Sequence, residues 1–167
     1  MESVRHAQLI GKHGEAGFTL PEIMLAISII VISVFIAVPN FMAMTARSQL
    51  KGATTELRAN LNAARMGAMA RNRTVTMTLA GGGAVPVTAT FTDAVGRVLP
   101  PITMNRAVTG FGGPAVLTFN SLGLCTGCGV VNQTITLTNN QGVTFSIQVT
   151  PGGKTKWCPQ AAPTCAG

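Results

Sequence analysis

The sequence predicts an α+β protein in which one long N-terminal helix packs on a mostly antiparallel β-sheet head. Three observations lead to this class. Residues 23–46 are apolar and carry no charge, residues 47–72 keep apolar side chains at helical spacing, and polar and apolar residues alternate in short segments from residue 73 onwards. A period of three to four residues is typical of a helix with one buried face, whereas strict alternation is typical of a half-buried strand.

Composition limits the classes of function. The chain has 167 residues, of which 47% are hydrophobic and 10% are charged, with 12 Lys plus Arg against 5 Asp plus Glu. The length fits one domain with an appendage, and the apolar balance excludes a mostly disordered chain. The net charge of +7 favours an anionic partner or a membrane surface.

The chain has few side chains that could serve in acid–base catalysis. Both histidines, His6 and His13, lie within the first 17 residues, and the acids after that point are Glu22, Glu56 and Asp93. General acid–base catalysis needs such groups in close pairs or triads. We therefore expect no enzyme activity, no catalytic residue, no cofactor and no small-molecule substrate.

The apolar run beginning at Ile23 is long enough to span the hydrocarbon core of a bilayer, which is about 30 Å thick. A secretory signal peptide would place its small-residue cleavage site after such a run. Here Ala16 and Gly17 precede it. Glu22 lies at the edge of the run, where a carboxylate is costly in lipid and needs a partner.

The segment Gly17-Phe18-Thr19-Leu20-Pro21-Glu22 resembles the class III signal of type IV pilins and type II secretion pseudopilins. The resemblance implies that prepilin peptidase cleaves after Gly17 and that the new terminal residue, Phe18, is N-methylated. It also implies that Glu22 pairs with the terminal amine of a neighbouring subunit during assembly. Pro39 matches the proline that kinks the family's helix, since proline removes one backbone hydrogen bond.

The same resemblance divides the chain into four parts. Residues 1–17 are a leader that is removed, 18–46 a transmembrane and filament-core helix, 47–72 an amphipathic helix, and 73–167 a β-rich head, together a lollipop. Basic residues in the leader fit a cytoplasmic N-terminus. The implied location is the bacterial inner membrane, with a single span and the head in the periplasm. The implied partners are the inner membrane, prepilin peptidase and other pilin or pseudopilin subunits.

The second half of the helix has two side-chain stripes. Its apolar stripe consists of Leu50, Leu57, Leu61, Ala64 and Ala68, and its basic stripe of Arg47, Lys51, Arg58 and Arg65. The apolar stripe predicts packing on the head. The basic stripe is explained by a solvated helix face, with lipid headgroups or a polyanion as alternative partners.

The head is expected to be β-structured. Alternation predicts strands at residues 74–79, 87–92, 115–119, 134–138 and 143–149, the last two as a hairpin with a four-residue turn at 139–142. Residues 100–114 are rich in Pro and Gly without a clean period, so we expect a long loop there.

Three segments of the chain resemble the GspH/FimT group of pseudopilins. They are the helix-to-strand join at 61–76, the Phe-x-x-x-Gly element at 119–123, and Gly153-Lys154-Thr155-Lys156-Trp157-Cys158, which stands where the group has Gly-Arg-x-Arg and a Cys. Both arginines of that element are lysines here. The resemblance implies a minor pilin or pseudopilin that acts at the initiation or the tip of a filament.

In FimT-like minor pilins the Gly-Arg-x-Arg element is linked to DNA binding during natural transformation. This resemblance makes Lys154 and Lys156 candidate polyanion ligands, with Trp157 as a stacking surface and DNA as an alternative partner. Lysine neutralises phosphate but lacks the bidentate fork of arginine. Alternatively, the two lysines protect an edge strand from aggregation. Arg97 and Arg106, in expected loops, are further candidates for the same surface.

The cysteines form a CxxC pair, Cys125 and Cys128, and a looser pair, Cys158 and Cys165. In an exported head such residues predict two disulfides, because disulfides persist in oxidising compartments. A metal site of four thiolates and a redox site are alternatives. Locality favours Cys125–Cys128 and Cys158–Cys165, and a cross-link between the loop and the tail remains open.

Overall fold

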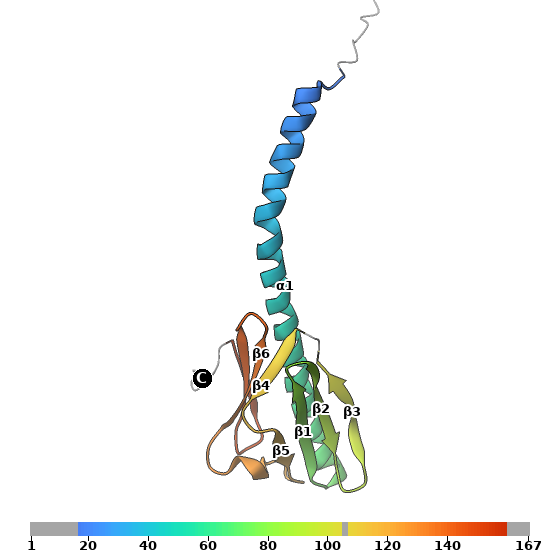
Figure 1. Cartoon of the computed structure of the whole chain (residues 1–167). Coiled ribbons are helices and arrows are strands. Elements are labelled where there is room, and N and C mark those ends of the chain that lie inside the picture. The colour runs from blue at the N-terminus through green and yellow to red at the C-terminus, as the bar shows by residue number, and fades with distance from the viewer. Residues whose placement is uncertain (1–16, 105–106, 160–167) are drawn as a thin grey trace, which may run out of the picture. The chain divides into compact units, whose positions relative to one another are not determined.

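The computed structural model describes residues 17–104 and 107–159, with the side chain of Pro39 not described. One helix, α1 (Leu20–Arg71), precedes all the strands (Figure 1). The chain divides into two units, Met1–Pro39 and Asn40–Gly167, and α1 contributes to both. The predicted α+β class, a long N-terminal helix followed by antiparallel sheet, is confirmed.

In the first unit α1 begins with a turn closed by Thr19. The Thr19 carbonyl accepts hydrogen bonds from the amides of Glu22 at 3.0 Å and Ile23 at 3.2 Å. Pro21 is compatible with this first turn because a proline there removes no intrahelical bond. Residues 20–38 are exposed at every position. The most apolar window of α1 has a mean hydropathy of 2.5 and no buried share, and its length suffices to cross a membrane.

In the second unit one face of α1 is buried. The predicted apolar stripe, from Leu50 to Ala68, has 0% exposure at Leu50, Leu57, Leu61, Ala64 and Ala68. The helix ends in a Schellman motif at Asn72, which has a positive φ of 49°. The Arg73 amide bonds the Ala68 carbonyl at 3.0 Å, and the Asn72 amide bonds the Met69 carbonyl at 3.2 Å.

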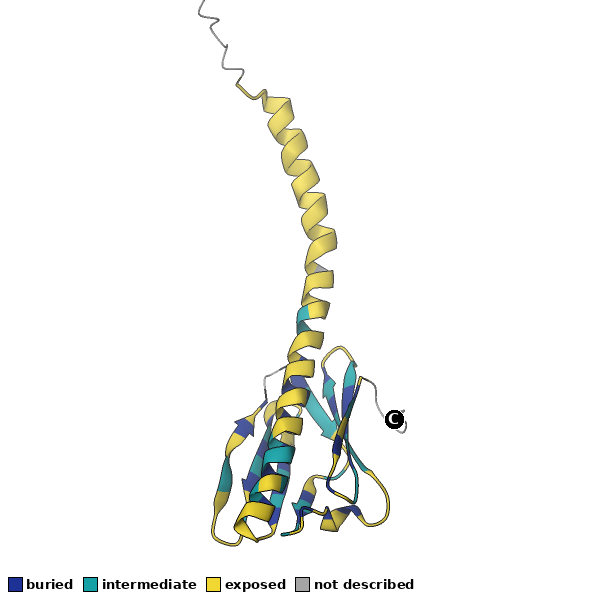
Figure 2. Cartoon of the chain, turned by 180° about the vertical axis from the view of Figure 1, so that it is seen from behind, coloured by how far each residue is buried: buried dark blue, intermediate teal, exposed yellow. Residues whose placement is uncertain are grey.

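The strands of the second unit form two antiparallel sheets. The first has the order β3-β2-β1-β5 and the second β4-β6-β7-β8. Their bounds are β1 Val75–Gly82, β2 Val85–Thr92, β3 Arg97–Thr103, β4 Val108–Gly112, β5 Val116–Phe119, β6 Gln133–Asn139, β7 Thr144–Val149 and β8 Thr155–Cys158. Buried residues of both sheets join the buried face of α1 in one apolar core. Figure 2 marks the buried residues in dark blue on the ribbon.

The predicted hairpin joins β6 and β7. Ile135 pairs with Ile147 and Leu137 with Phe145, so the apolar residues of both strands share the core face. Asn139 shapes the turn, because its Oδ1 accepts hydrogen bonds from the amides of Gln141 at 3.0 Å and Val143 at 2.9 Å. Alternation and turn chemistry therefore agree in this segment.

The expectation of a long loop over residues 100–114 was wrong. This stretch holds most of β3 and all of β4. Each is an edge strand, and each has a register irregularity, at the Pro100-Pro101 pair in β3 and between Val108 and Gly110 in β4. Edge strands and bulges tolerate Pro and Gly because one side of the ladder needs no partner. Because Pro and Gly are also typical of loops, the sequence pattern did not indicate strands in this stretch.

Candidate assembly surface and basic elements

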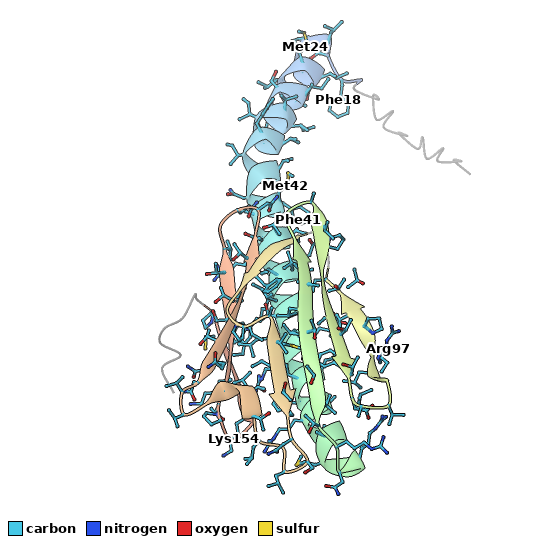
Figure 3. All side chains as sticks on the ribbon, turned by 60° about the horizontal axis from the view of Figure 1, so that its bottom comes forward. Phe18, Met24, Phe41, Met42, Arg97 and Lys154 are labelled. Carbon is cyan, nitrogen blue, oxygen red and sulfur yellow. A yellow bond between two sulfur atoms is a disulfide. The ribbon has the colours of Figure 1, made fainter. Side chains whose placement is uncertain are left out.

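The residues expected to direct processing and assembly lie at the start of α1. Gly17 and Phe18 precede the helix, and Phe18 is 75% exposed. Figure 3 labels Phe18 at this end of α1. Glu22 is exposed in the first turn, where its negative charge is favoured by the helix dipole. Within the described residues Glu22 has no cationic partner. Pro39 lies inside α1, where it lacks the amide that would bond the preceding turn.

Arg65, in the second half of α1, lies against the Phe-x-x-x-Gly element at Gly123 and the basic C-terminal element at Gly153. Its Nε donates a hydrogen bond to the Gly123 carbonyl at 2.8 Å. Gly123 and Gly153 are both buried and both have a φ of +74°. A Cβ at Gly153 would collide with the Gly123 carbonyl oxygen and lie 2.7 Å from Arg65 Nε. The close approach of three chain segments therefore requires glycine at position 153.

The basic C-terminal element continues from this joint into β8. The buried Thr155 donates a hydrogen bond through Oγ1 to Asn62 Oδ1 of α1 at 2.8 Å. Lys154 and Lys156, on either side of it, are exposed. Because β8 is an edge strand, these lysines stand where the edge-protection alternative puts them. They also stand beside the part of α1 that carries Arg65.

Trp157 packs on the core of the head. Its ring stacks on Phe145 with centroids 5.4 Å apart and planes 19° apart. The Lys51 ammonium lies 5.7 Å from the centre of the indole, within the range of a cation–π contact. Trp157 thus joins β8 to β7 and to α1, with only part of its surface in contact with solvent.

The remaining basic candidates do not gather at this element. Arg97 is exposed on β3, an edge of the first sheet, whereas Lys154 precedes β8, an edge of the second. Figure 3 shows the two side chains on separate parts of the head. Arg106 lies outside the described residues.

The CxxC pair forms a disulfide. Cys125 and Cys128 are bonded across η1 (Thr126–Cys128), and both are buried. The Cys125 amide donates to the Pro151 carbonyl at 2.9 Å, which ties this loop to the turn before β8. Cys158 is also disulfide-bonded, and Cys165 lies outside the described residues. Within the described residues no three His, Cys, Asp or Glu side chains form a group that could hold a metal.

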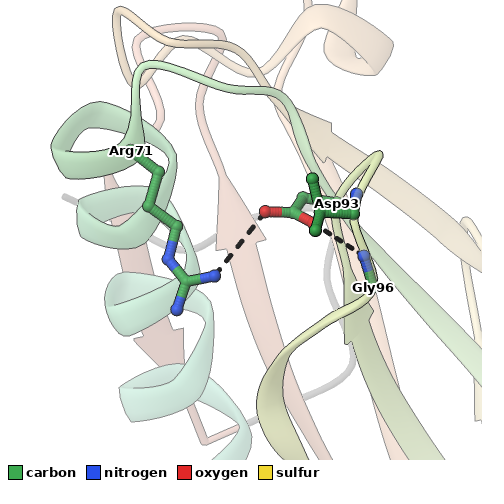
Figure 4. A network of polar contacts seen from close by, with 4 residues as sticks. Arg71, Asp93 and Gly96 are labelled. Atoms are coloured by element: carbon green, nitrogen blue, oxygen red, sulfur yellow. Dashed lines mark hydrogen bonds and ion pairs between the residues drawn. The ribbon is translucent and has the colours of Figure 1, made fainter.

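Asp93 closes the turn between β2 and β3, a role that the sequence patterns described above do not predict. Its Oδ1 accepts hydrogen bonds from the amides of Val95 at 2.8 Å and Gly96 at 2.9 Å, and its Oδ2 lies 3.6 Å from Arg71 Nη1 (Figure 4). The Val95 amide, together with Gly96 and the Arg71 charge, lowers the pKa of Asp93. The Asp-x-x-Gly spacing is a turn signal that could have identified it.

Comparison with known proteins settles the family. The family model described as type II transport protein GspH matches residues 53–153, which is more than half of the chain. The chain belongs to the GspH/FimT family of pilin-like proteins. That match contains the Arg65 joint, with Gly123 and Gly153, and excludes the apolar half of α1. The sequence has no significant match among proteins of curated function.

Solved structures of one pilin share the fold of this GspH/FimT protein. A crystal structure of the type IV minor pilin FimU from Pseudomonas aeruginosa PAO1 has a TM-score of 0.54 at 21% identity, covering 73% of this chain and 98% of FimU. A second crystal form gives 0.53 at 19% identity, covering 70% and 99%. The family is one of structural filament subunits, and the apolar N-terminal helix fits a membrane-anchored subunit.

Proposed function

We propose that this chain is a minor subunit of a type II secretion pseudopilus or a type IV pilus, and that it acts in initiating the filament or at its tip. Before assembly it is anchored in the inner membrane by residues 18–46, with the head in the periplasm. The observation that carries the proposal is the first half of α1. It is apolar on all sides, wholly exposed, and has a single acid in its first turn.

Such an apolar surface is unfavourable in water, and the described part of the chain does not bury it. Lipid covers it while the subunit is in the membrane, and the apolar helices of neighbouring subunits cover it in a filament. Glu22 would be costly inside that bundle unless a cation lies at close range. We propose that cleavage after Gly17 by prepilin peptidase creates this cation as the N-methylated amine of Phe18, donated by the adjacent subunit.

The assembly role of Glu22 is tested by Glu22→Ala, with Glu56→Ala as the matched control. Glu56 is the other acid of α1, and it is exposed in the second half of the helix. Glu22→Ala should leave the protein in the membrane fraction but remove it from sheared filaments, whereas Glu56→Ala should remain in both. Equal recovery of the two variants in filaments would contradict the proposal.

The minor position in the filament is tested by abundance and by deletion. A subunit that initiates assembly should be scarce in sheared filaments, and its deletion should reduce the number of filaments more than their length. If this chain were instead the dominant band of purified filaments, it would be a major pilin and the initiation role would fail.

We keep DNA contact as a second candidate function because the fold brings two basic elements together. The Thr155–Asn62 bond and the Gly153–Arg65 approach place Lys154 beside the basic stripe of α1, where Arg58 and Asn62 line one shallow hollow. Two or three phosphate contacts would give weak, salt-sensitive binding. Binding of the intact protein to DNA at low salt should fall in the double variant Lys154→Ala, Lys156→Ala. Unchanged binding would leave only the structural role.

A further inference from the structure

The strongest unassigned feature is a pocket between α1 and the second sheet. It has a volume of about 360 Å³ and lies entirely in the second unit. Its lining consists of Met44, Arg47, Ser48, Lys51, Phe145, Trp157 and Pro159. The floor is therefore made of two stacked aromatic rings, and two cations stand on the helix above it.

Among the described residues, neither of the two cations has an anionic partner. Arg47 and Lys51 are both exposed and lie one helical turn apart, so they repel each other. The single ion pair found among the described residues joins Arg71 to Asp93, elsewhere in the head. Lys51 is also held over the Trp157 ring. An anion between Arg47 and Lys51 would relieve the repulsion and bind to groups that are already in place.

The position of the pocket along the chain indicates the source of that anion. Arg47 is the first charged residue after the uncharged run 23–46. If that run spans the bilayer, the pocket opens at the level of the lipid headgroups. Tryptophan is enriched at this level, and Lys and Arg there attract anionic lipids. In the proposed orientation the positive-inside rule does not call for cations at this end of the span.

We propose that this pocket binds the headgroup of an anionic phospholipid. The phosphate lies between Arg47 and Lys51, and the apolar lining formed by Met44, Phe145 and Trp157 contacts the glycerol and the upper acyl chain. The indole Nε1 is buried, so Trp157 contributes ring surface to the site. The site would hold the head on the membrane until assembly removes the subunit from the lipid. This inference rests on the membrane anchoring proposed above.

The chain provides its own probe for the test. Trp157 is its single tryptophan and it has no tyrosine, so its emission reports on this pocket alone. The full chain is placed in nanodiscs of mixed phosphatidylglycerol and phosphatidylcholine, with dibrominated acyl chains on one lipid at a time. Quenching of Trp157 by each brominated lipid gives the relative binding constant of the two headgroups at the pocket.

We expect the relative binding constant to favour phosphatidylglycerol over phosphatidylcholine by roughly 25-fold. Arg47 and Lys51 should each contribute about fivefold. Lys51→Gln should reduce the preference to about fivefold, and Arg47→Gln with Lys51→Gln should abolish it. Arg97→Gln removes a charge from the far sheet edge and should leave the preference unchanged. Equal quenching by the two lipids, or quenching by neither, would overturn the proposal.

Two further measurements distinguish a failure of the membrane anchor from a failure of the pocket, and a lipid ligand from a soluble phosphate. Co-elution of the protein with the discs reports on membrane anchoring alone, so a chain that does not co-elute contradicts both the anchor and the pocket. A chain that co-elutes without lipid preference contradicts only the pocket. Millimolar glycerol phosphate should not relieve quenching by phosphatidylglycerol. If it does, the pocket takes a soluble phosphate and the assignment to lipid is wrong.

Discussion

The two halves of α1 obey the same helical geometry but bury their side chains differently. Residues 20–38 are exposed at every position, including large side chains such as Ile32 at 62% and Phe35 at 77%. From Leu50 to Ala68 one face is fully buried against two sheets, and the exposed positions include the charged residues Lys51, Glu56 and Arg58. The second half is therefore stabilised by its own chain. The first half has an apolar surface that something outside the described chain must cover.

The largest expected effect is the difference in stability between a substitution in the second half of α1 and one in the first half. Leu61→Ala removes a side chain with 0% exposure and should lower the free energy of unfolding of the head by about 2–5 kcal/mol. Ile32→Ala should leave it unchanged, because Ile32 is exposed. The measurement is urea unfolding of the detergent-solubilised chain, followed by Trp157 fluorescence. An equal loss in both variants would mean that the halves are not distinct.

A substitution at Gly153 should lower the stability of the head almost as much as the truncation of a core side chain. Gly153→Ala forces a side chain into a positive φ and against the Gly123 carbonyl and Arg65, so we expect a loss of about 2–4 kcal/mol. Gly152→Ala is the matched control, since a Cβ there meets only Thr150 Oγ1 at 3.8 Å. The same unfolding assay compares the two variants. Similar stabilities would show that α1 and the C-terminal element are not locked together at this point.

The disulfide should contribute less because it closes a short loop. Removing the Cys125–Cys128 bond by the double change to Ala should cost about 2 kcal/mol, the chain-entropy value for a loop of this size. Thermal unfolding without reductant compares the variant with the parent chain. Assembly into filaments should not change in the variant if the first half of α1 carries the assembly contacts.

The smallest effect should come from Asp93 and should depend on pH. The pKa of Asp93 is lowered in the folded head, so its contribution is present above the unfolded carboxyl pKa of about 4. It is lost as the pH falls through the lowered folded value. Asp93→Asn should therefore be less stable than the parent at neutral pH, and the two should converge in acid. A constant difference between the two chains from neutral pH into acid would contradict this assignment.

Local patterns in the sequence predicted much of the fold. The stripe from Leu50 to Ala68 and the alternation in β6 and β7 each record one buried face, which a period in the sequence reveals. The edge strands β3 and β4 were missed because Pro100, Pro101, Gly110 and Gly112 read as loop signals when the position in a sheet is unknown.

Contacts between distant segments could not be predicted in the same way. Gly153 meets Arg65, and Trp157 stacks on Phe145, only because sheet register and helix packing bring them together. The sequence identified Gly153, Lys154, Lys156 and Trp157 through a resemblance. Their division into a buried glycine joint, two exposed lysines and a packed ring is visible only in the fold.

The measurement that tests the central claim most directly is the intact mass and N-terminal peptide of the chain extracted from membranes without reductant. We predict a chain that starts at N-methylated Phe18 and is lighter than its reduced form by two hydrogens for each of two disulfides. This result would support pilin processing and the second pairing, Cys158–Cys165, together. A chain that still starts at Met1 when prepilin peptidase is present would contradict the claim that this protein is a processed filament subunit.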